Sequence, residues 1–235
     1  MNSTFSEIDG KSAVFFSRVD SVHDKHPKGC TLDDAVELIR SDRLRPAVDA
    51  IRATYNSVLQ ATNSETEAKK AVKDMKAAMP AFMFAGLFSG RGDTGLTQPS
   101  GLVVTDLDHL DSDAQARLRA QLVADPCVVL AYASPSSGIK AVYRARADRP
   151  HAANFAAVRD RVRAATGLGI DESGKNPERL CFASWDPDAY YNPNAEELPV
   201  PDLRVLEIEV PQPQNSILPL PKVVPERTPE EIAAL

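Results

Sequence analysis

The chain has 235 residues, 43% of them hydrophobic, and a formal net charge of −6 at pH 7. This composition excludes a disordered chain and supplies enough apolar side chains for one large or two small domains. No apolar run approaches the ~18 residues of a membrane-spanning helix, and the N-terminus lacks the basic and apolar stretches of a secretory signal. Three widely spaced cysteines are typical of a reducing compartment, so we expect a cytoplasmic protein without disulfides.

The charge is unevenly distributed. Residues 196–235 contain eight acids and three bases, whereas residues 136–180 contain nine bases and five acids. The central region is therefore locally basic, which is compatible with binding a polyanion such as DNA and also with an ordinary solvated surface. Arg144, Arg146 and Lys175 are the weak candidates for a DNA contact in this region.

Strand-like and helix-like segments are mixed along the chain. Thr31 is a capping residue before a helical pattern, and Pro80 ends a later one. The predicted helices cover residues 31–39, 44–59, 64–78, 111–124 and 154–165. The predicted strands cover residues 12–17, a segment ending at Asp106, 128–133, 139–146 and 180–183. An apolar, Phe-rich segment over residues 81–89 precedes a polar glycine loop.

The character of the sequence changes after Leu198. Eight of the 18 prolines lie between Pro199 and Pro229, which indicates a linker or extended arm over residues 198–227. A capping-box pattern with proline at the first helical position predicts a further helix or domain from residue 228. We therefore expect one domain over residues 1–197, with an N-terminal module of about 1–80 and a core of about 81–197, at the front of a longer protein.

Asp106 and Asp108 follow directly on an apolar strand-like run. Because side chains alternate along a strand, residues two apart point to the same side, and the two carboxylates lie next to each other. Carboxylates this close repel unless a cation lies between them or one is protonated. The pair therefore predicts a metal site, and the alternative is a solvated turn between a strand and a helix.

The segment from Ser134 to Lys140 predicts a tight turn between two strands. Ser136, Ser137 and Gly138 are small enough for backbone N–H groups to approach an anion, and Lys140 adds a positive charge. An ordinary hairpin turn with an exposed lysine is the alternative.

Asp171 ends a third apolar stretch. It is positioned to complete a three-carboxylate site, and Arg179 downstream is suited to bidentate phosphate binding. A polar loop with a surface ion pair explains the same residues.

The order of these three segments resembles the archaeo-eukaryotic primase superfamily. More closely, it is similar to the primase–polymerase domain at the front of virulence-associated-E-like and related mobile-element replication proteins. The resemblance covers roughly residues 15–193 and includes the Asp-x-Asp pair, the Ser-x-Ser-Ser-Gly-x-Lys turn and the hydrophobic-Asp step at Asp171. Lys140 stands where most of the superfamily has a histidine.

The resemblance implies an α/β (α+β) fold with an RRM-like antiparallel catalytic sheet flanked by helices and an N-terminal α/β module. It implies two Mg²⁺ or Mn²⁺ ions held by Asp106, Asp108 and Asp171, and phosphate contacts from Ser136, Ser137, Gly138, Lys140 and Arg179. The implied activity is that of a template-dependent DNA primase or polymerase. Its partners would be nucleoside triphosphates, a single-stranded template or primer–template, and a helicase downstream or in trans.

Two other functions fit parts of the sequence. The segment around Asp106 also resembles the nucleophile motif of haloacid-dehalogenase-type phosphatases, in which Asp106 would attack phosphate. About 100 residues precede it, however, and Asp186 and Asp188 are poor candidates for that family's second acidic pair. The remaining alternative is a catalytically silent DNA-binding replication-initiation module that does not use its carboxylates.

Overall fold

The computed structural model describes residues 14–91, 95–108 and 112–199. The chain divides into two compact units, Met1–Val200 and Pro201–Leu235, and all described residues belong to the first. The helix predicted at 228–235 and most of the predicted arm lie outside the described residues. So do the beginning of the strand predicted at 12–17, the centre of the glycine loop and Asp111.

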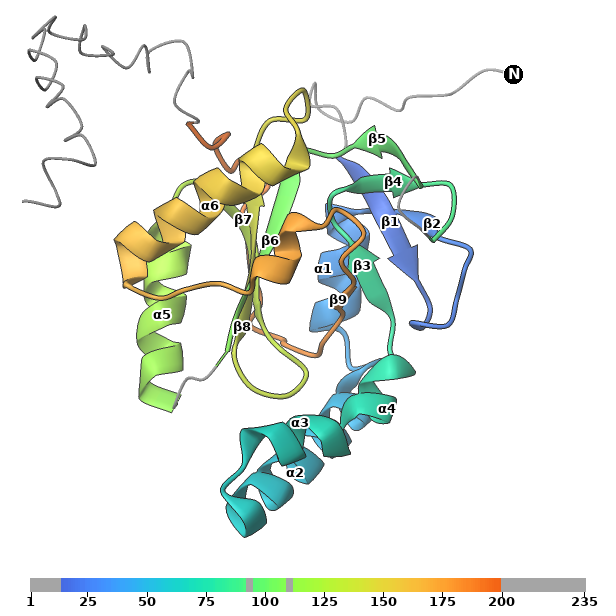
Figure 1. Ribbon diagram of the computed structural model, residues 1–235, viewed down its shortest axis with the longest axis vertical. Helices are drawn as coiled ribbons and strands as arrows, with labels where there is room; N and C mark the ends of the chain where they lie inside the picture. The colour runs from blue at the N-terminus through green and yellow to red at the C-terminus, as the bar shows by residue number, and fades with distance from the viewer. Residues whose placement is uncertain (1–13, 92–94, 109–111, 200–235) are drawn as a thin grey trace, which may run out of the picture. The chain divides into compact units, whose positions relative to one another are not determined.

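Short strands and helices follow each other along the described chain (Figure 1). The strands are β1 Phe15–Val19, β2 Lys28–Thr31, β3 Ala81–Met83, β4 Gly86–Phe88, β5 Leu96–Pro99, β6 Leu102–Leu107, β7 Val128–Ala133, β8 Ile139–Arg144, β9 Cys181–Phe182 and β10 Tyr190–Tyr191. The helices are α1 Leu32–Arg40, α2 Arg45–Thr62, α3 Glu65–Ala71, α4 Lys73–Ala77, α5 Ser112–Ala124, α6 His151–Thr166 and the 3₁₀ turn η1 Glu172–Lys175.

One antiparallel sheet has the order β2-β1-β3-β9. Its strands come from both of the parts predicted at about 1–80 and 81–197, so these parts share a sheet. The neighbouring ribbon of β4 and β5 is also antiparallel. Among the described residues, no helix has the length and apolar character needed to cross a membrane.

A second antiparallel sheet, with the order β10-β7-β8-β6, carries the candidate site. The chain order β6-α5-β7-β8-α6 confirms an α+β fold in which helices flank an antiparallel sheet. The fourth strand, β10, pairs with β7, at the edge away from β6. At the outer edge of β6 lies η1, whose Gly174 approaches the carbonyl oxygen of Val104.

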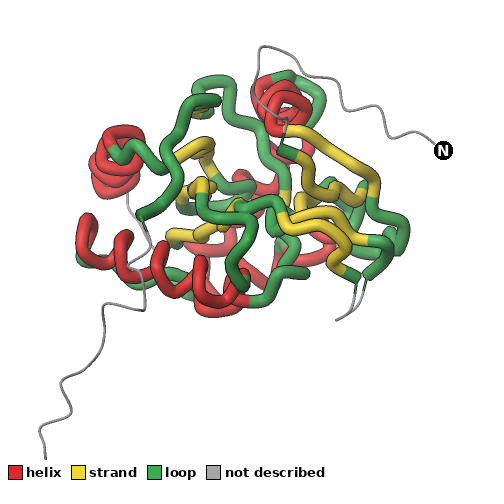
Figure 2. Tube along the Cα trace, turned by 90° about the horizontal axis from the view of Figure 1, so that it is seen from above, coloured by secondary structure: helices red, strands yellow, loops and turns green. Residues whose placement is uncertain are grey.

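Apolar side chains cover both faces of this second sheet. On one face, Leu118 of α5 and Phe155 of α6 pack against Val103 of β6. On the other, Ile39 of α1 packs with Leu102 of β6 and strand residues of the first sheet. Seen from above, helices lie on either side of the strands (Figure 2). The sheet is therefore fixed on both faces, which gives its strand ends defined positions.

Helices α2, α3 and α4 form a helical module with a small core of its own, around Val48, Ile51 and Tyr55. The predicted helix over 64–78 is interrupted at Val72, which is the C-cap of α3 and the N-cap of α4.

The helical module is fixed to the segment after β9. Its Arg52 donates hydrogen bonds to the carbonyl oxygens of Ser134 and Trp185, both at 3.1 Å. The Arg45 guanidinium lies 4.8 Å from the centre of the Trp185 ring. These contacts hold the module beside the turn between β7 and β8.

Candidate functional site

Asp106 lies near the end of β6, opposite Lys140 of β8 in the antiparallel register. It shares its side of the strand with Leu102 and Val104, which pack into the core, because side chains two apart in a strand point the same way. Asp108 follows one residue after the strand ends. The alternation of side chains along β6 therefore directs the Asp106 carboxylate to the same side as Leu102 and Val104, at the edge of the core.

Asp171 comes to the same region from a separate part of the chain. It is the N-cap of η1, and its carboxylate accepts hydrogen bonds from the Ser173 backbone N–H at 2.9 Å and the Ser173 hydroxyl at 2.6 Å. Arg179 Nη2 lies 3.1 Å from Asp171 Oδ2. Partial burial raises the pKa of Asp171, but the Ser173 hydrogen bonds and the Arg179 charge outweigh this and leave the pKa below its usual value.

These side chains line one cleft of about 620 Å³. The lining includes the three predicted aspartates together with Lys140 and Arg179. The cleft contains four acids and five bases, namely Asp106, Asp108, Asp171 and Glu178 with Lys69, Lys76, Arg91, Lys140 and Arg179. Four carboxylates in one concave site would repel one another strongly without these cations.

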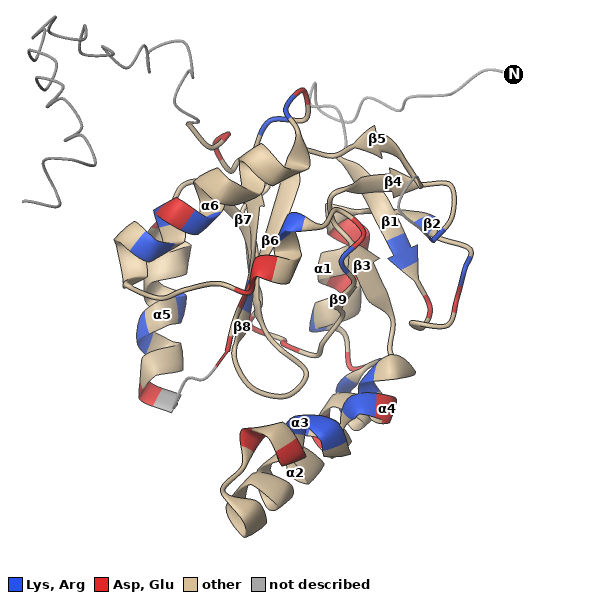
Figure 3. Cartoon of the chain, in the orientation of Figure 1, with Lys and Arg blue, Asp and Glu red and all other residues tan. Residues whose placement is uncertain are grey.

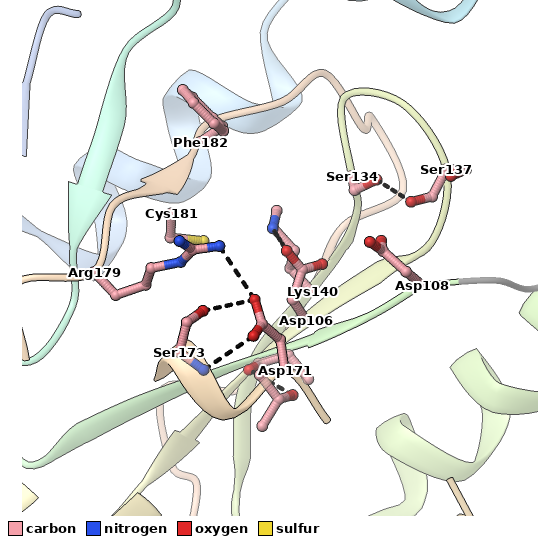
Figure 4. Close-up of polar contacts among 12 residues, drawn as sticks. Asp106, Asp108, Ser134, Ser137, Lys140, Asp171, Ser173, Arg179, Cys181 and Phe182 are labelled. Carbon is pink, nitrogen blue, oxygen red and sulfur yellow. Dashed lines mark hydrogen bonds and ion pairs between the residues drawn. The ribbon is translucent and has the colours of Figure 1, made fainter. Parts of the chain in front are cut away.

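Each of the three aspartates is paired with a different cation. Lys140 Nζ donates to Asp106 Oδ2, and Lys69 Nζ lies 3.0 Å from Asp108 Oδ2. Figure 4 shows Lys140 directed at Asp106 and Arg179 directed at Asp171. Over the described ranges, no three acidic, histidine or cysteine side chains are grouped closely enough to hold one metal ion. The carboxylates therefore share the cleft but are held apart by their ion pairs.

Lys140 is the most deeply buried charge of the cleft, with 5% of its surface exposed. Burial alone would lower its pKa, but the charge of Asp106 and further anions outweigh this and raise the pKa above its usual value. Lys140 thus keeps its positive charge although it is buried.

Two carboxylate oxygens of the cleft residues, Asp106 Oδ1 and Glu178 Oε1, are buried without a hydrogen-bond partner among the described residues. Asp106 Oδ1 is inaccessible to solvent and accepts no hydrogen bond from any described residue. A cavity of about 20 Å³, large enough for one water molecule, is lined by Asp106 together with Asp171, Thr105 and Cys181. An unpartnered carboxylate oxygen next to such a space favours a bound water or cation between Asp106 and Asp171.

The serine–glycine turn lies beside the cleft. Ser134 donates through its hydroxyl to the Ser137 carbonyl oxygen at 2.6 Å (Figure 4). Gly138 has φ +101°, and a Cβ there would lie 2.4 Å from the carbonyl oxygen of Leu107 and 2.8 Å from Asp108 Oδ1. Glycine is therefore required because the turn packs directly against the residue pair that carries Asp108. The residues of the turn predicted to bind phosphate, Ser136, Ser137 and Gly138, are absent from the described lining of the cleft.

The three weak candidates for DNA binding also lie outside that lining. Arg144 is at the other end of β8 from Lys140 and donates to the Pro193 carbonyl oxygen at 3.4 Å. Arg146 forms a bidentate pair with Asp148 at 2.9 and 2.6 Å, and Lys175 ends η1.

Eight lining residues were not predicted from the sequence: Val22, Lys69, Lys76, Arg91, Asn176, Glu178, Leu180 and Phe182. Lys69 and Lys76 belong to a run of lysines along residues 69–76, a pattern that usually marks a solvated helix face. They lie on different helices, α3 and α4, and both line the cleft only because the helical module contacts the sheet.

Comparison with known proteins places this site within a family. Residues 74–191 match the family described as BT4734-like, N-terminal domain. The chain belongs to this family. The matched part of this BT4734-like domain contains Asp106, Asp108, Lys140, Asp171 and Arg179, and it begins before Lys76 but after Lys69. No curated protein and no solved structure matches the chain.

Proposed function

We propose that this BT4734-like domain is a template-dependent nucleotidyltransferase, a DNA primase or DNA polymerase that uses two divalent metal ions. The observation that supports this most strongly is the gathering of three aspartates from two distant segments, with Lys140 and Arg179, around one cleft. The cleft volume of about 620 Å³ lies in the range of small-molecule sites and suits a nucleotide. The proposal includes membership of the archaeo-eukaryotic primase superfamily.

The donor chemistry of these residues suits the ions that the proposal requires, and the ion pairs that hold the three carboxylates apart in the structure would have to open. Carboxylate oxygens are the ligands that Mg²⁺ and Mn²⁺ prefer, and Asp106 Oδ1 is an unpartnered buried oxygen beside a small cavity. Asp106, Asp108 and Asp171 would hold the ions. The bound ions would activate the attacking hydroxyl and neutralise charge on the triphosphate. Lys140, Lys69 and Arg179, which pair with these carboxylates in the structure, would then be released.

The released cations have a role in the same reaction. Lys140 and Arg179 approach the cleft from two sides of the aspartates, and their donors suit phosphate oxygens. Charge-assisted hydrogen bonds to the β- and γ-phosphates would orient the triphosphate in line with the attacking hydroxyl and stabilise the pyrophosphate that leaves. A lysine at position 140 donates but cannot accept a hydrogen bond, so its part is limited to binding and charge stabilisation.

The proposed partners follow from this activity. They are nucleoside triphosphates, a single-stranded template or primer–template, and a helicase domain that acts in the same replication process, for example of a mobile element, plasmid or phage. Template binding across basic surface residues would weaken as salt concentration rises.

The test is nucleotide incorporation by the purified protein on a primed and an unprimed template, with Mg²⁺ or Mn²⁺. We expect incorporation by the wild type and a loss of at least about 10³-fold in Asp108→Asn and Asp171→Asn, because metal-held charge supplies several kcal/mol to the transition state. Asp148→Asn is the matched control, since Asp148 is also an exposed aspartate paired with an arginine but lies outside the cleft.

The alternatives predict different results. A wild type that binds DNA and incorporates no nucleotide with either metal would be the silent replication-initiation module. Release of phosphate from small phosphoesters, with an aspartyl-phosphate trapped at Asp106, would indicate the phosphatase. Against the phosphatase, Asp186 is engaged by Arg119 and the Ala133 backbone N–H, and neither Asp186 nor Asp188 lines the cleft.

A further inference from the structure

Lys76 is a cation of the cleft without an anionic partner. Its side chain forms no hydrogen bond or ion pair with any residue that the structure describes, and its ammonium lies 5.4 Å from the centre of the Phe182 ring. Burial first, and then the positive charge of Lys140, lowers the pKa of Lys76 below its usual value. A lysine held in a partly desolvated position beside another cation is stabilised when an anion binds between them.

Lys69 of the helical module lines the same cleft as Lys76. Lys69 belongs to α3 and Lys76 to α4, on the two sides of the break at Val72. Figure 3 shows the basic residues of α3 and α4 next to each other. Lys69 is held by Asp108 at 3.0 Å, and Glu65 lies 4.0 Å from its ammonium group.

The helices that carry the two lysines are held in place by packing and hydrogen bonds. Their module has its own core and is fixed to the segment after β9 by Arg52. Phe182 of β9 and Trp185 of the segment after it pack against the core of the module. The lysine ammonium groups are therefore carried on packed helices that are joined to the sheet.

We propose that Lys69 and Lys76 form a phosphate-binding wall of the cleft that holds the polyphosphate of a nucleoside triphosphate. This deepens the proposed function, and it rests on that function only for the identity of the nucleotide. The helical module thereby acts as part of the nucleotide site. Lys69 exchanges Asp108 for phosphate when a metal ion takes over the carboxylate, whereas Lys76 is available from the start.

The shape of the site favours a compact polyphosphate over an extended strand. Lys69, Lys76, Lys140, Arg91 and Arg179 converge on one concave cleft. A nucleic-acid backbone needs cations spaced along a track several nucleotides long, whereas a triphosphate presents its charge within a few ångströms. Converging cations therefore match the triphosphate.

The experiment measures binding of inorganic tripolyphosphate by calorimetry to the wild type, Lys76→Met and Lys69→Met, in EDTA and again with Mg²⁺. Losing one charge-assisted phosphate contact should weaken binding about tenfold, in both buffers for Lys76→Met and with Mg²⁺ for Lys69→Met. Lys73→Met and Lys70→Met are the matched controls, because each removes an exposed lysine of the same helices that does not line the cleft. We expect the controls to change binding less than twofold, and thermal melting verifies that every variant is folded.

Binding of a short oligodeoxythymidine without terminal phosphates distinguishes recognition of a nucleic-acid backbone from recognition of a triphosphate. Unchanged tripolyphosphate affinity in Lys76→Met and Lys69→Met, or no tripolyphosphate binding by the wild type in either buffer, would overturn the proposal. So would a loss confined to the oligonucleotide, which would make the wall a strand-binding surface. If tripolyphosphate binding depends on Lys76 but the protein incorporates no nucleotide, the phosphate-binding wall is supported and the proposed polymerase function is wrong.

If the protein incorporates nucleotides and Lys76→Met leaves the KM for nucleotide unchanged, the proposed function is supported and the phosphate-binding wall is wrong.

Discussion

Lys69 Nζ lies 3.0 Å from Asp108 Oδ2, although 39 residues separate the two in the chain. The contact joins the helical module to the end of the strand that carries the candidate metal ligands. A lysine in this position supplies the positive charge that a metal ion would supply, so it would compete with the proposed ion for the carboxylate.

Removal of that lysine should therefore strengthen metal binding. We expect Lys69→Met to raise the affinity of the cleft for Mn²⁺ several-fold, measured by titration with free Mn²⁺ followed by electron paramagnetic resonance. Lys70→Met, which removes an exposed neighbouring charge, controls for the general loss of one cation. Equal effects of the two substitutions would show that Lys69 does not occupy the metal position.

The Asp106–Lys140 pair makes a prediction about stability. Asp106→Asn leaves the ammonium of Lys140 buried without its counter-charge, which should lower the free energy of unfolding by about 3 kcal/mol or more. Adding Lys140→Met in the double variant should restore part of this loss, because no buried charge remains. Urea unfolding of the two single variants and the double variant gives the coupling energy. A coupling close to zero would mean that the two groups do not stabilise each other.

A side chain at position 138 should destabilise the protein through a steric clash as well as through the unfavourable backbone conformation. In Gly138→Ala the new Cβ would lie 2.4 Å from the Leu107 carbonyl oxygen in addition to having φ +101°, so we expect a loss of about 3 kcal/mol or more. Gly167→Ala is the control, because Gly167 has φ +73° with no atom within 4 Å and should lose only about 1 kcal/mol. Chemical denaturation measures both. Similar losses for the two variants would contradict the packing of the turn against Asp108.

His151 predicts the direction of one pH dependence. Burial lowers the pKa of His151 below its usual 6.5, and its Nε2 lies 3.0 Å from the Gly174 carbonyl oxygen of η1. The unfolded chain therefore binds more protons than the folded one below pH 6.5, so this contribution to stability is complete above that pH and is lost as the pH falls toward the folded pKa. His151→Gln should flatten the stability profile below about pH 6.5, measured by thermal melting, while the exposed His26 supplies the control variant His26→Gln. A profile as steep as that of the wild type would exclude this role.

Local sequence signals predicted much of the fold. The Thr31 capping residue is part of a capping box with Asp34 at the start of α1, and the helices predicted at 44–59 and 154–165 are present as α2 and α6. The break at Val72 was not predicted, because no glycine or proline marks it. Strands β2 and β10 were missed since they are short and their residues, such as Lys28 and Gly29, carry no alternating apolar pattern.

The candidate site, like the fold, could be predicted from the sequence only in part. Strand alternation predicted that Asp106 and Asp108 lie together, because period-two geometry is local. The approach of Asp171 depends on η1 lying along the outer edge of β6, which is a tertiary contact without a local sequence signal. Lys69 and Lys76 were visible only as a charged helix pattern, since their direction depends on how the helical module contacts the sheet. The positions of Ser136 and Ser137 outside the cleft lining likewise depend on the twist of a turn that the sequence does not determine.

The most direct measurement of the central claim is incorporation of single nucleotides on four homopolymeric templates with Mn²⁺. The account predicts that the wild type adds only the nucleotide complementary to each template, and that Asp171→Asn loses this incorporation while Asp148→Asn keeps it. Incorporation of the same nucleotide on every template, undiminished incorporation by Asp171→Asn, or no incorporation by a folded wild type would contradict it.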